Sequence, residues 1–288
     1  MITILRISHV KLFLGVIPLI FGGFNASWGT SYPFELARPL YVGARALGMG
    51  NAFTAVADDA TAGFWNPAGL IQWQGVKIFG ATKIHDRRDY AFDPKGIGYS
   101  YRGNAFFWGN KIALRVDEGI TDYPQRLCGT PDFNYYSFGR QVGSYLAIGL
   151  SLKFKRKHPA NYYQFFGRDF SYDVAILSRP SPRIQIGVLM QNLPQKRAIN
   201  LISFGFSYRR PRIIISTDFV LSPSEIAELE IHFGAEWKIN RYLRFRAGAS
   251  ETHPTLGLGI VIRSLRLDYA WIREYGLGSH FMSAEFKG

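Results

Sequence analysis

Cysteine is almost absent from this chain of 288 residues, and long uninterrupted apolar runs are missing as well. The single Cys128 excludes a disulfide framework and any metal site built from several cysteines. Charged residues make up only 19% of the chain and hydrophobic residues 47%, so the polar bias of disordered segments is lacking. No stretch after the N-terminus reaches the roughly 18 uncharged apolar residues that a membrane-spanning helix needs. A soluble β-rich domain and a β-barrel of an outer membrane remain.

Acidic residues are also scarce, with 21 Asp and Glu against 34 Lys and Arg, which gives a formal net charge of +13. Residues 1–29 nevertheless have the pattern of a secretory signal, because Arg6 and Lys11 flank the start of an apolar stretch at 12–24. Small residues that could be cleavage sites follow at Ala26, Ser27 and Gly29. A short membrane anchor is the alternative, but the apolar stretch is shorter than the roughly 20 residues that cross a bilayer. We therefore expect export to the bacterial outer membrane and no nucleic-acid partner.

Alternation of apolar and polar residues is the dominant pattern after about residue 72. In 228–238, every second residue from Leu229 to Trp237 is apolar, and polar or small residues lie between them. The same pattern recurs in 144–156, 242–250 and 265–271. A soluble sandwich also alternates in this way, but aromatic residues at strand ends favour a membrane barrel. So does glycine on the polar face, at Gly149, Gly187, Gly205, Gly234, Gly248, Gly257 and Gly259.

The pattern predicts 14 strands joined mainly by short turns, an even number as bacterial barrels require. Most have about the 9–11 residues of a tilted membrane-spanning strand. Longer connections at 118–132 and 157–167 are expected to be extracellular loops. The predicted strands are 75–84, 95–102, 104–116, 133–141, 144–156, 168–178, 183–191, 198–209, 212–221, 226–239, 241–250, 254–263, 264–273 and 278–287.

Residues 42–70 depart from this alternation and are rich in small side chains. Asp58 or Asp59 can cap a short helix that runs through about Phe64, and Asn66-Pro67 ends it in a turn. Small residues allow close packing, and the lumen of the barrel is the natural place for such a segment. The sequence thus predicts a signal peptide at 1–29, an N-terminal luminal segment at 30–74 and a transmembrane antiparallel barrel at 75–288.

The stretch 42–70, with Asn66-Pro67-Ala68-Gly69 near its end, resembles the N-terminal signature of the PorV/PorQ outer-membrane proteins, which belong with the FadL-type transporters. Residues 267–271 and 277–281, with Phe286, resemble the last two strands of that family. The resemblance covers only the two ends of the chain, and it implies a barrel of 14 strands with a luminal plug. The candidate plug residues are Gly43, Arg45, Gly48, Gly50, Asp58, Asp59, Asn66, Pro67 and Gly69.

This chain departs from the family in two respects. It is shorter than typical members, so long extracellular loops are missing. It also ends on Lys287-Gly288, whereas a barrel-insertion signal usually closes on an aromatic residue, and Phe286 is expected to serve instead.

Catalytic motifs are not found in the sequence. The histidines form no HExxH pair, no Gly-Lys-Ser/Thr follows Gly48-Met49-Gly50, and no Gly-x-Ser-x-Gly elbow occurs. Asp58 and Asp59 could form a catalytic carboxylate pair, but adjacent residues at a helix start point in different directions, which favours capping. We expect no catalytic residue, no metal and no cofactor, and therefore a protein that is not an enzyme.

Charged residues on the expected luminal face are the remaining clue. They include acids and bases, so they can neutralise one another and fix the wall; alternatively, they form a basic path for anionic ligands such as fatty carboxylates. His232, beside Glu230 and Glu236, could hold a proton or a metal, or could belong to a salt-linked wall. The candidate luminal charges are Lys153, Lys155, Glu230, His232, Glu236, Arg244, Arg246, Arg266 and Asp268.

Two functions follow from the sequence. The first is a PorV/PorQ-like protein that serves protein export or docking at the outer membrane, with secretion-system or exported proteins as partners. The alternative is a FadL-like passive channel for hydrophobic small molecules such as fatty acids. The luminal positions are largely Gly, Ser and charged residues, which argues against an apolar pocket and favours the first. Outer-membrane lipid is the partner common to both.

Overall fold

The computed structural model describes residues 42–84, 94–111, 133–155, 169–193, 201–222, 228–250, 253–274 and 277–288. The predicted signal peptide and the loops expected at 118–132 and 157–167 lie outside these residues. The strands are β1 (Gly75–Ile84), β2 (Lys95–Tyr101), β3 (Asn104–Lys111), β4 (Phe133–Gln141), β5 (Leu146–Lys155), β6 (Asp169–Ser181), β7 (Ile184–Leu193), β8 (Leu201–Arg209), β9 (Ile213–Ser222), β10 (Glu228–Lys238), β11 (Leu243–Ser250), β12 (His253–Ile262), β13 (Leu265–Glu274) and β14 (Leu277–Lys287).

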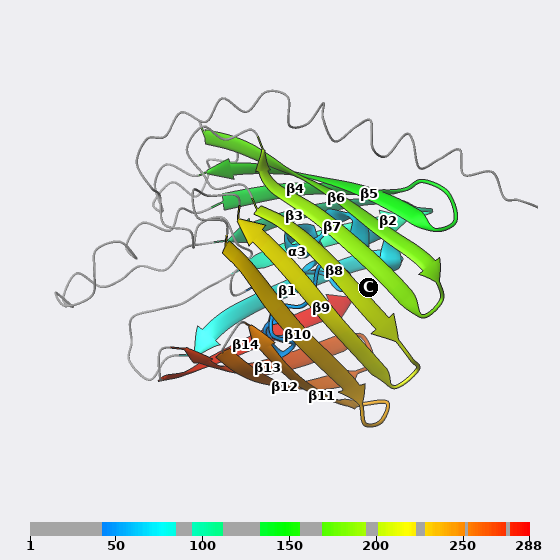
Figure 1. Cartoon of the computed structure of the whole chain (residues 1–288). Helices are drawn as coiled ribbons and strands as arrows, with labels where there is room; N and C mark the ends of the chain where they lie inside the picture. The colour runs from blue at the N-terminus through cyan, green and yellow to red at the C-terminus, as the bar shows by residue number, and fades with distance from the viewer. Residues whose placement is uncertain are drawn as a thin grey trace, which may run out of the picture. The chain divides into compact units, whose positions relative to one another are not determined.

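The strands form a closed antiparallel barrel in which each strand pairs with the next along the chain (Figure 1). β1 pairs with β14 and closes the ring, with Lys77 opposite Lys287 and Ile84 opposite His280. Closure leaves no unpaired strand edge, which is the condition for a sheet to lie in hydrocarbon. The predicted barrel of 14 strands is therefore confirmed. Within the described residues, no helix is both long and apolar enough to cross a membrane.

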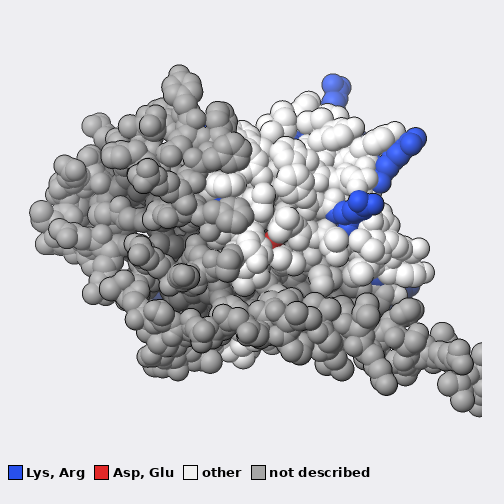
Figure 2. Space-filling model, turned by 90° about the horizontal axis from the view of Figure 1, so that it is seen from above, with Lys and Arg blue, Asp and Glu red and all other residues white. Residues whose placement is uncertain are grey.

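The outer face of the barrel is apolar and the inner face is polar or tightly packed. On β5, Ile148 is 45% exposed whereas its neighbour Ala147 is 2% exposed. On β10, Leu229, Phe233 and Trp237 face outward while the intervening acidic side chains are buried. Figure 2 accordingly shows a described surface that is largely uncharged, apart from a few Lys and Arg and one small acidic area. The alternation in the sequence thus assigned the lipid-facing and luminal faces correctly.

Residues 42–74, here called the luminal segment, precede β1 and fold as three short turns of helix inside the ring of strands. They are α2 (Ala44–Gly48), α3 (Ala62–Trp65) and the 3₁₀-helix η2 (Pro67–Gln72). α2 packs against β11 to β14, whereas η2 packs against β2 to β6. The segment therefore spans the lumen from one side of the wall to the other.

The predicted capping of the helix is corrected in detail. α3 begins at Ala62 after Thr61, and no side chain caps its first turn. Asp59 Oδ1 instead accepts the backbone N–H of Thr61 at 2.9 Å, one turn earlier. Asn66 ends the helix as expected, because its side chain accepts the N–H of Ala68 at 3.0 Å and so starts η2. α2 was not predicted, since its five residues are too few to show a helical period.

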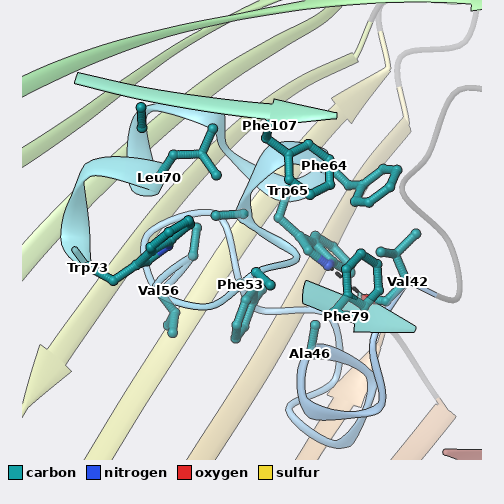
Figure 3. Close-up of a cluster of buried hydrophobic side chains, with 14 of the residues drawn as sticks. Val42, Ala46, Phe53, Val56, Phe64, Trp65, Leu70, Trp73, Phe79 and Phe107 are labelled. Carbon is teal, nitrogen blue, oxygen red and sulfur yellow. Dashed lines mark hydrogen bonds between the residues drawn. The ribbon is translucent and has the colours of Figure 1, made fainter. Parts of the chain in front are cut away.

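The main apolar core lies inside the barrel, between the luminal segment and the wall (Figure 3). Phe64 of α3 is at its centre: its ring centroid is 5.1 Å from that of Phe107 on β3 and 4.7 Å from that of Tyr135 on β4. The ring centroid of Phe79 on β1 lies 5.8 Å from that of Phe64 and completes this aromatic group. The expectation of a largely polar luminal face is therefore wrong for β1, β3 and β4. The segment covers their inward rings, which makes both the rings and the segment part of one core.

Candidate functional site

Arg45 of α2 is the first of several buried charges that tie the luminal segment to the wall. Its guanidinium group donates to Glu236 of β10 through Nε at 2.8 Å and through Nη2 at 3.1 Å. Its Nη1 also contacts Asp58 and lies 3.2 Å from Asp59 Oδ2. The two adjacent aspartates therefore converge on one arginine, which corrects the prediction that they would point in different directions.

The contacts of Arg45 continue into a network of buried ion pairs. Glu236 also accepts from Arg246 Nε at 2.7 Å, and Arg246 lies 2.8 Å from Asp268. Arg266 Nη2 contacts both Asp59 at 3.0 Å and Glu285 at 3.1 Å. The ion-pair network consists of five cations and five carboxylates: Arg45, Lys77, Arg209, Arg246 and Arg266 with Asp58, Asp59, Glu236, Asp268 and Glu285.

Because the network holds equal numbers of opposite charges, it can be buried without leaving a net charge in the lumen. Burial alone raises the pKa of Asp58, but the positive charges of Arg45 and Arg209 outweigh this effect and hold that pKa well below its usual range. Asp58 therefore stays ionised at neutral pH and keeps both arginines in place. The geometry indicates that these charges attach the segment to the wall and do not form a continuous basic path for anions.

The wall also satisfies backbone groups of the luminal segment, which has too little helix to satisfy them itself. Asp218 of β9 accepts the N–H groups of Phe53 at 2.9 Å and Thr54 at 2.7 Å. Ser283 Oγ of β14 accepts the N–H of Ala44 at 3.1 Å. These contacts fix the path of the segment across the lumen.

Glycine on the luminal face lets the segment approach the wall closely. A Cβ atom at Gly149 would lie 2.2 Å from the backbone nitrogen of Ala68, and one at Gly248 would lie 2.5 Å from that of Gly50. Real Cβ atoms are not found so close to backbone atoms, so only glycine fits at these positions. Other wall glycines in similarly close contact with the segment are Gly139, Gly187, Gly205, Gly234 and Gly257.

Most of the candidate plug residues lie where the segment turns or packs closely against its neighbours. Gly43 and Gly50 have positive φ angles of 83° and 60°, which glycine adopts readily. Gly48 packs on Gly257, and Gly69 lies against the carbonyl of Ala57. Pro67 occupies the first position of η2, where its missing N–H costs nothing.

The remaining candidate charges lie in smaller groups. Lys153 is buried and lies 2.5 Å from Asp173 of β6. His232 Nε2 lies 3.4 Å from Glu230, and its Nδ1 is 2.9 Å from Ser250 Oγ. Arg244 is half-buried at the start of β11, and the side chain of Lys155 is outside the described structure. Of the nine candidates, the structure brings Glu236, Arg246, Arg266 and Asp268 into the ion-pair network.

Sequence reasoning missed Lys77, Arg209, Asp218 and Glu285, although each lies within a predicted strand. Lys77 lies 3.0 Å from Glu285 across the closing pair of strands. The alternation in 75–84 and 278–287 would have placed both side chains in the lumen. Lys77 is on the same face of its strand as Gly75 and Ala81, and Glu285 is on the same face as Ser279 and Ser283.

One small cavity lies between the luminal segment and strands β7 to β10. Its volume is about 40 Å³, and its lining includes Thr54, Trp65, Asp218, Glu230 and His232. A water molecule needs roughly 10–15 Å³ by this measure, so the cavity has room for a few waters only. Within the described residues, no group of three or more His, Cys, Asp or Glu is arranged to hold a metal ion. Most side chains of the luminal segment are buried, so it packs closely in the part of the lumen that the structure describes.

Neither a protein-family model nor a curated protein matches the chain. Among solved structures, it is similar to a FadL homologue of Pseudomonas aeruginosa, with 10% identity and a TM-score of 0.60 over 87% of this chain and 99% of that one. It is also similar to the CymD monoaromatic hydrocarbon channel, with 14% identity and a TM-score of 0.59 over 88% of this chain and 99% of that one. The Pseudomonas putida toluene transporter TodX gives 12% identity and a TM-score of 0.58, over 87% and 98% respectively.

At such low identity the likeness concerns the fold. It confirms the predicted barrel fold. Membership of the FadL-type superfamily and the resemblance to PorV/PorQ proteins stay predictions.

Proposed function

We propose that the protein is a passive channel of the bacterial outer membrane for small apolar molecules, and that the luminal segment closes it until the segment shifts. The observation that carries the proposal is a segment that packs inside the lumen and is held there by ion pairs, hydrogen bonds and apolar contacts. Its only covalent connection to the wall is the chain that leads into β1. The same fold occurs in a monoaromatic hydrocarbon channel and a toluene transporter. Proteins named as channels or transporters also support a role that is not enzymatic.

The two sides of the luminal segment suggest how it moves. On the side of β10 to β14, the ion-pair network holds α2, and separating a buried ion pair costs about 3–5 kcal/mol. On the side of β1 to β4, Phe64 packs against the rings of Phe79, Phe107 and Tyr135. Two side chains of these strands also donate to backbone carbonyls of the segment, Ser137 to Gly63 at 2.7 Å and Lys77 to Asp58 at 3.4 Å. An apolar molecule can replace such ring contacts without leaving a charge unpaired. We therefore expect the passage to open on the aromatic side.

The present cavity is too small for such a molecule. Its volume of about 40 Å³ compares with the roughly 150 Å³ of an engineered protein cavity that binds benzene. Passage therefore requires a displacement of the luminal segment, and a cross-link that prevents this displacement must close the channel.

The test is a reversible cross-link between η2 and β4, in a background in which Cys128→Ser removes the native thiol. Leu70 Cβ lies 3.3 Å from the position that a Cβ at Gly139 would take, close to the separation of about 3.5–4.5 Å found in disulfides. The same Cβ would lie 2.7 Å from the carbonyl oxygen of Pro67, so the substitution itself displaces η2 slightly. Gly139→Cys alone is therefore the control, because its uptake should not change on oxidation. Leu70→Cys with Gly139→Cys is reconstituted in vesicles, and uptake of toluene and oleate is measured. We expect uptake by the reduced form and none by the oxidised form. Equal uptake by both would contradict a moving segment.

Deletion of residues 45–68 gives an independent measurement. The deleted barrel is expected to conduct ions more readily in planar bilayers, because the segment no longer fills the lumen. Unchanged single-channel conductance would refute its role as a plug. Because the deletion also removes Arg45 from the ion-pair network, the disulfide variant remains the decisive test if the deleted chain does not insert.

A second candidate function is protein export or docking at the outer membrane. It is favoured by the filled lumen with its balanced charges, and by the resemblance of residues 42–70 to the PorV/PorQ signature. Native mass spectrometry of the protein, gently extracted from its own membrane, separates the two functions. A stoichiometric protein partner would support docking, whereas a retained apolar molecule without a protein would support the channel.

A further inference from the structure

Exposed basic side chains gather at one end of the barrel, where six short turns join β2 to β3, β4 to β5, β6 to β7, β8 to β9, β10 to β11 and β12 to β13. We call this end the tight-turn rim. Backbone hydrogen bonds join each turn to its neighbour, as from the N–H of Arg209 to the carbonyl of Arg183 at 2.7 Å. The exposed cations of the rim are Arg102, Arg140, Arg183, Arg210, Arg212, Arg241, Arg263 and Lys287.

This positive charge is not neutralised within the described part of the protein. None of the acidic side chains that the structure describes is exposed, because they are buried in the lumen or, like Asp58, half-buried against it. None of the eight rim cations forms an ion pair with another described residue. Figure 2 shows Lys and Arg side chains projecting from the described surface without acidic neighbours.

Several rim arginines lie at the border of the apolar outer face. The guanidinium carbon of Arg241 lies 4.5 Å from the ring centre of Tyr242, and that of Arg102 lies 5.1 Å from the ring centre of Tyr101. Arg210 donates to the hydroxyl of Tyr208 at 2.7 Å. Tyrosine prefers the headgroup level of a bilayer, so these arginines lie at the depth of the lipid phosphates.

We propose that the tight-turn rim binds the anionic headgroups of phospholipids in the membrane leaflet that surrounds it. Arginine can donate two parallel hydrogen bonds to a phosphate, and the tyrosine contacts limit the freedom of three of the guanidinium groups beforehand. Short turns of such barrels face the periplasm, so this leaflet is the inner leaflet of the outer membrane. An acidic protein would need no alignment of arginines with tyrosines at the edge of the apolar face, and this alignment favours lipid.

The experiment is a titration of the purified full-length protein in neutral detergent with phosphatidylglycerol or phosphatidylcholine, followed by native mass spectrometry. The rim variant carries Arg102→Gln, Arg210→Gln and Arg241→Gln. The matched control carries Lys95→Gln and Arg273→Gln, which remove two exposed cations at the opposite end of the barrel.

We expect the unmodified protein to bind phosphatidylglycerol more tightly than phosphatidylcholine. The rim variant is expected to lose this preference, with its affinity for phosphatidylglycerol lowered about tenfold or more, since each basic group near an anionic surface contributes about fivefold. The control should keep the preference. Equal affinity of the unmodified protein for the two lipids would overturn the proposal, as would an equal loss in the control. A rim variant that keeps the affinity of the unmodified protein for phosphatidylglycerol would likewise overturn it.

Discussion

Glu236 is the residue on which the attachment of the luminal segment most depends, because its carboxylate lies between the guanidinium groups of Arg45 and Arg246. Its side chain is 1% exposed, so water cannot replace it. A buried ion pair adds little net stability against an apolar alternative, but removal of one partner leaves a buried charge uncompensated. Loss of one member of the network should therefore destabilise the protein more than the net contribution of the whole network to stability suggests.

Glu236→Gln is expected to lower the free energy of unfolding by about 3–5 kcal/mol, because two guanidinium groups lose their shared counter-charge. Denaturant unfolding in lipid vesicles, followed by tryptophan fluorescence, measures the change. Lys238→Gln is the control, since Lys238 is half-buried near the end of the same strand, and its effect should stay within about 0.5 kcal/mol. Equal effects of the two substitutions would show that Glu236 does not hold the segment.

A substitution at Ile148 tests whether the apolar outer face of the barrel meets lipid. Ile148 is the third residue of β5, opposite Arg140 of β4, and is 45% exposed, so Ile148→Arg places a charge on the apolar outer face toward its tight-turn end. We expect a loss between the about 2–4 kcal/mol that an arginine costs at the bilayer midplane and the about 0–1 kcal/mol that it costs near the interface. Impaired insertion is measured as the folded fraction after dilution into vesicles. Ile148→Val keeps the face apolar and should insert normally. Normal insertion of the arginine variant would mean that this face does not meet lipid.

At the scale of elements, the fit of η2 and α2 to the wall depends on how closely two backbones can approach. Gly149→Ala introduces a Cβ 2.2 Å from the nitrogen of Ala68, so η2 must move away from β5. Gly80→Ala on β1 is the matched control, because no atom lies within 4 Å of its Cβ position.

We expect Gly149→Ala to raise the ion conductance of reconstituted barrels, since displacement of η2 opens a path along the wall. Gly80→Ala should conduct like the unmodified protein. Single-channel recording in planar bilayers distinguishes the two. Identical conductance of both variants would show that the contact between η2 and β5 does not close the lumen.

At the scale of the whole molecule, the luminal segment should respond to acid. The pKa of Asp58 is held well below its usual range in the folded protein, whereas an unfolded aspartate titrates near about 3.9. A lowered pKa contributes stability that is fully present above the unfolded value and is lost as the pH falls through the folded value.

Conductance is therefore expected to stay constant from neutral pH down to about 4, the pKa of an unfolded aspartate. It should rise only at a pH well below this value, where protonation of Asp58 frees Arg45 and Arg209. Asp58→Asn should conduct at neutral pH as the unmodified protein does in acid. A steep rise between pH 7 and 6 would point to another titratable group beside the segment, such as His232 or Asp218, and would contradict the assignment to Asp58.

The sequence by itself determined the barrel, because alternation with a period of two is a local property that each strand carries alone. It placed β1 and β4 with both bounds correct, and it assigned Ile148 to the outer face and Glu236 to the lumen. The small residues of 42–70 predicted that this segment packs closely inside the barrel. The count of strands followed from the same pattern and from the short turns between them.

Only the tertiary structure decided which luminal residues meet. Arg45 and Glu236 are separated by 191 positions, and their contact depends on the tilt and stagger of the closed barrel, which no short stretch of sequence specifies. For the same reason the convergence of Asp58 and Asp59 on one arginine was not foreseen, nor was the cover that Phe64 provides for the inward rings of β1, β3 and β4. Local alternation decides which way a side chain faces, and closure of the ring decides what it faces.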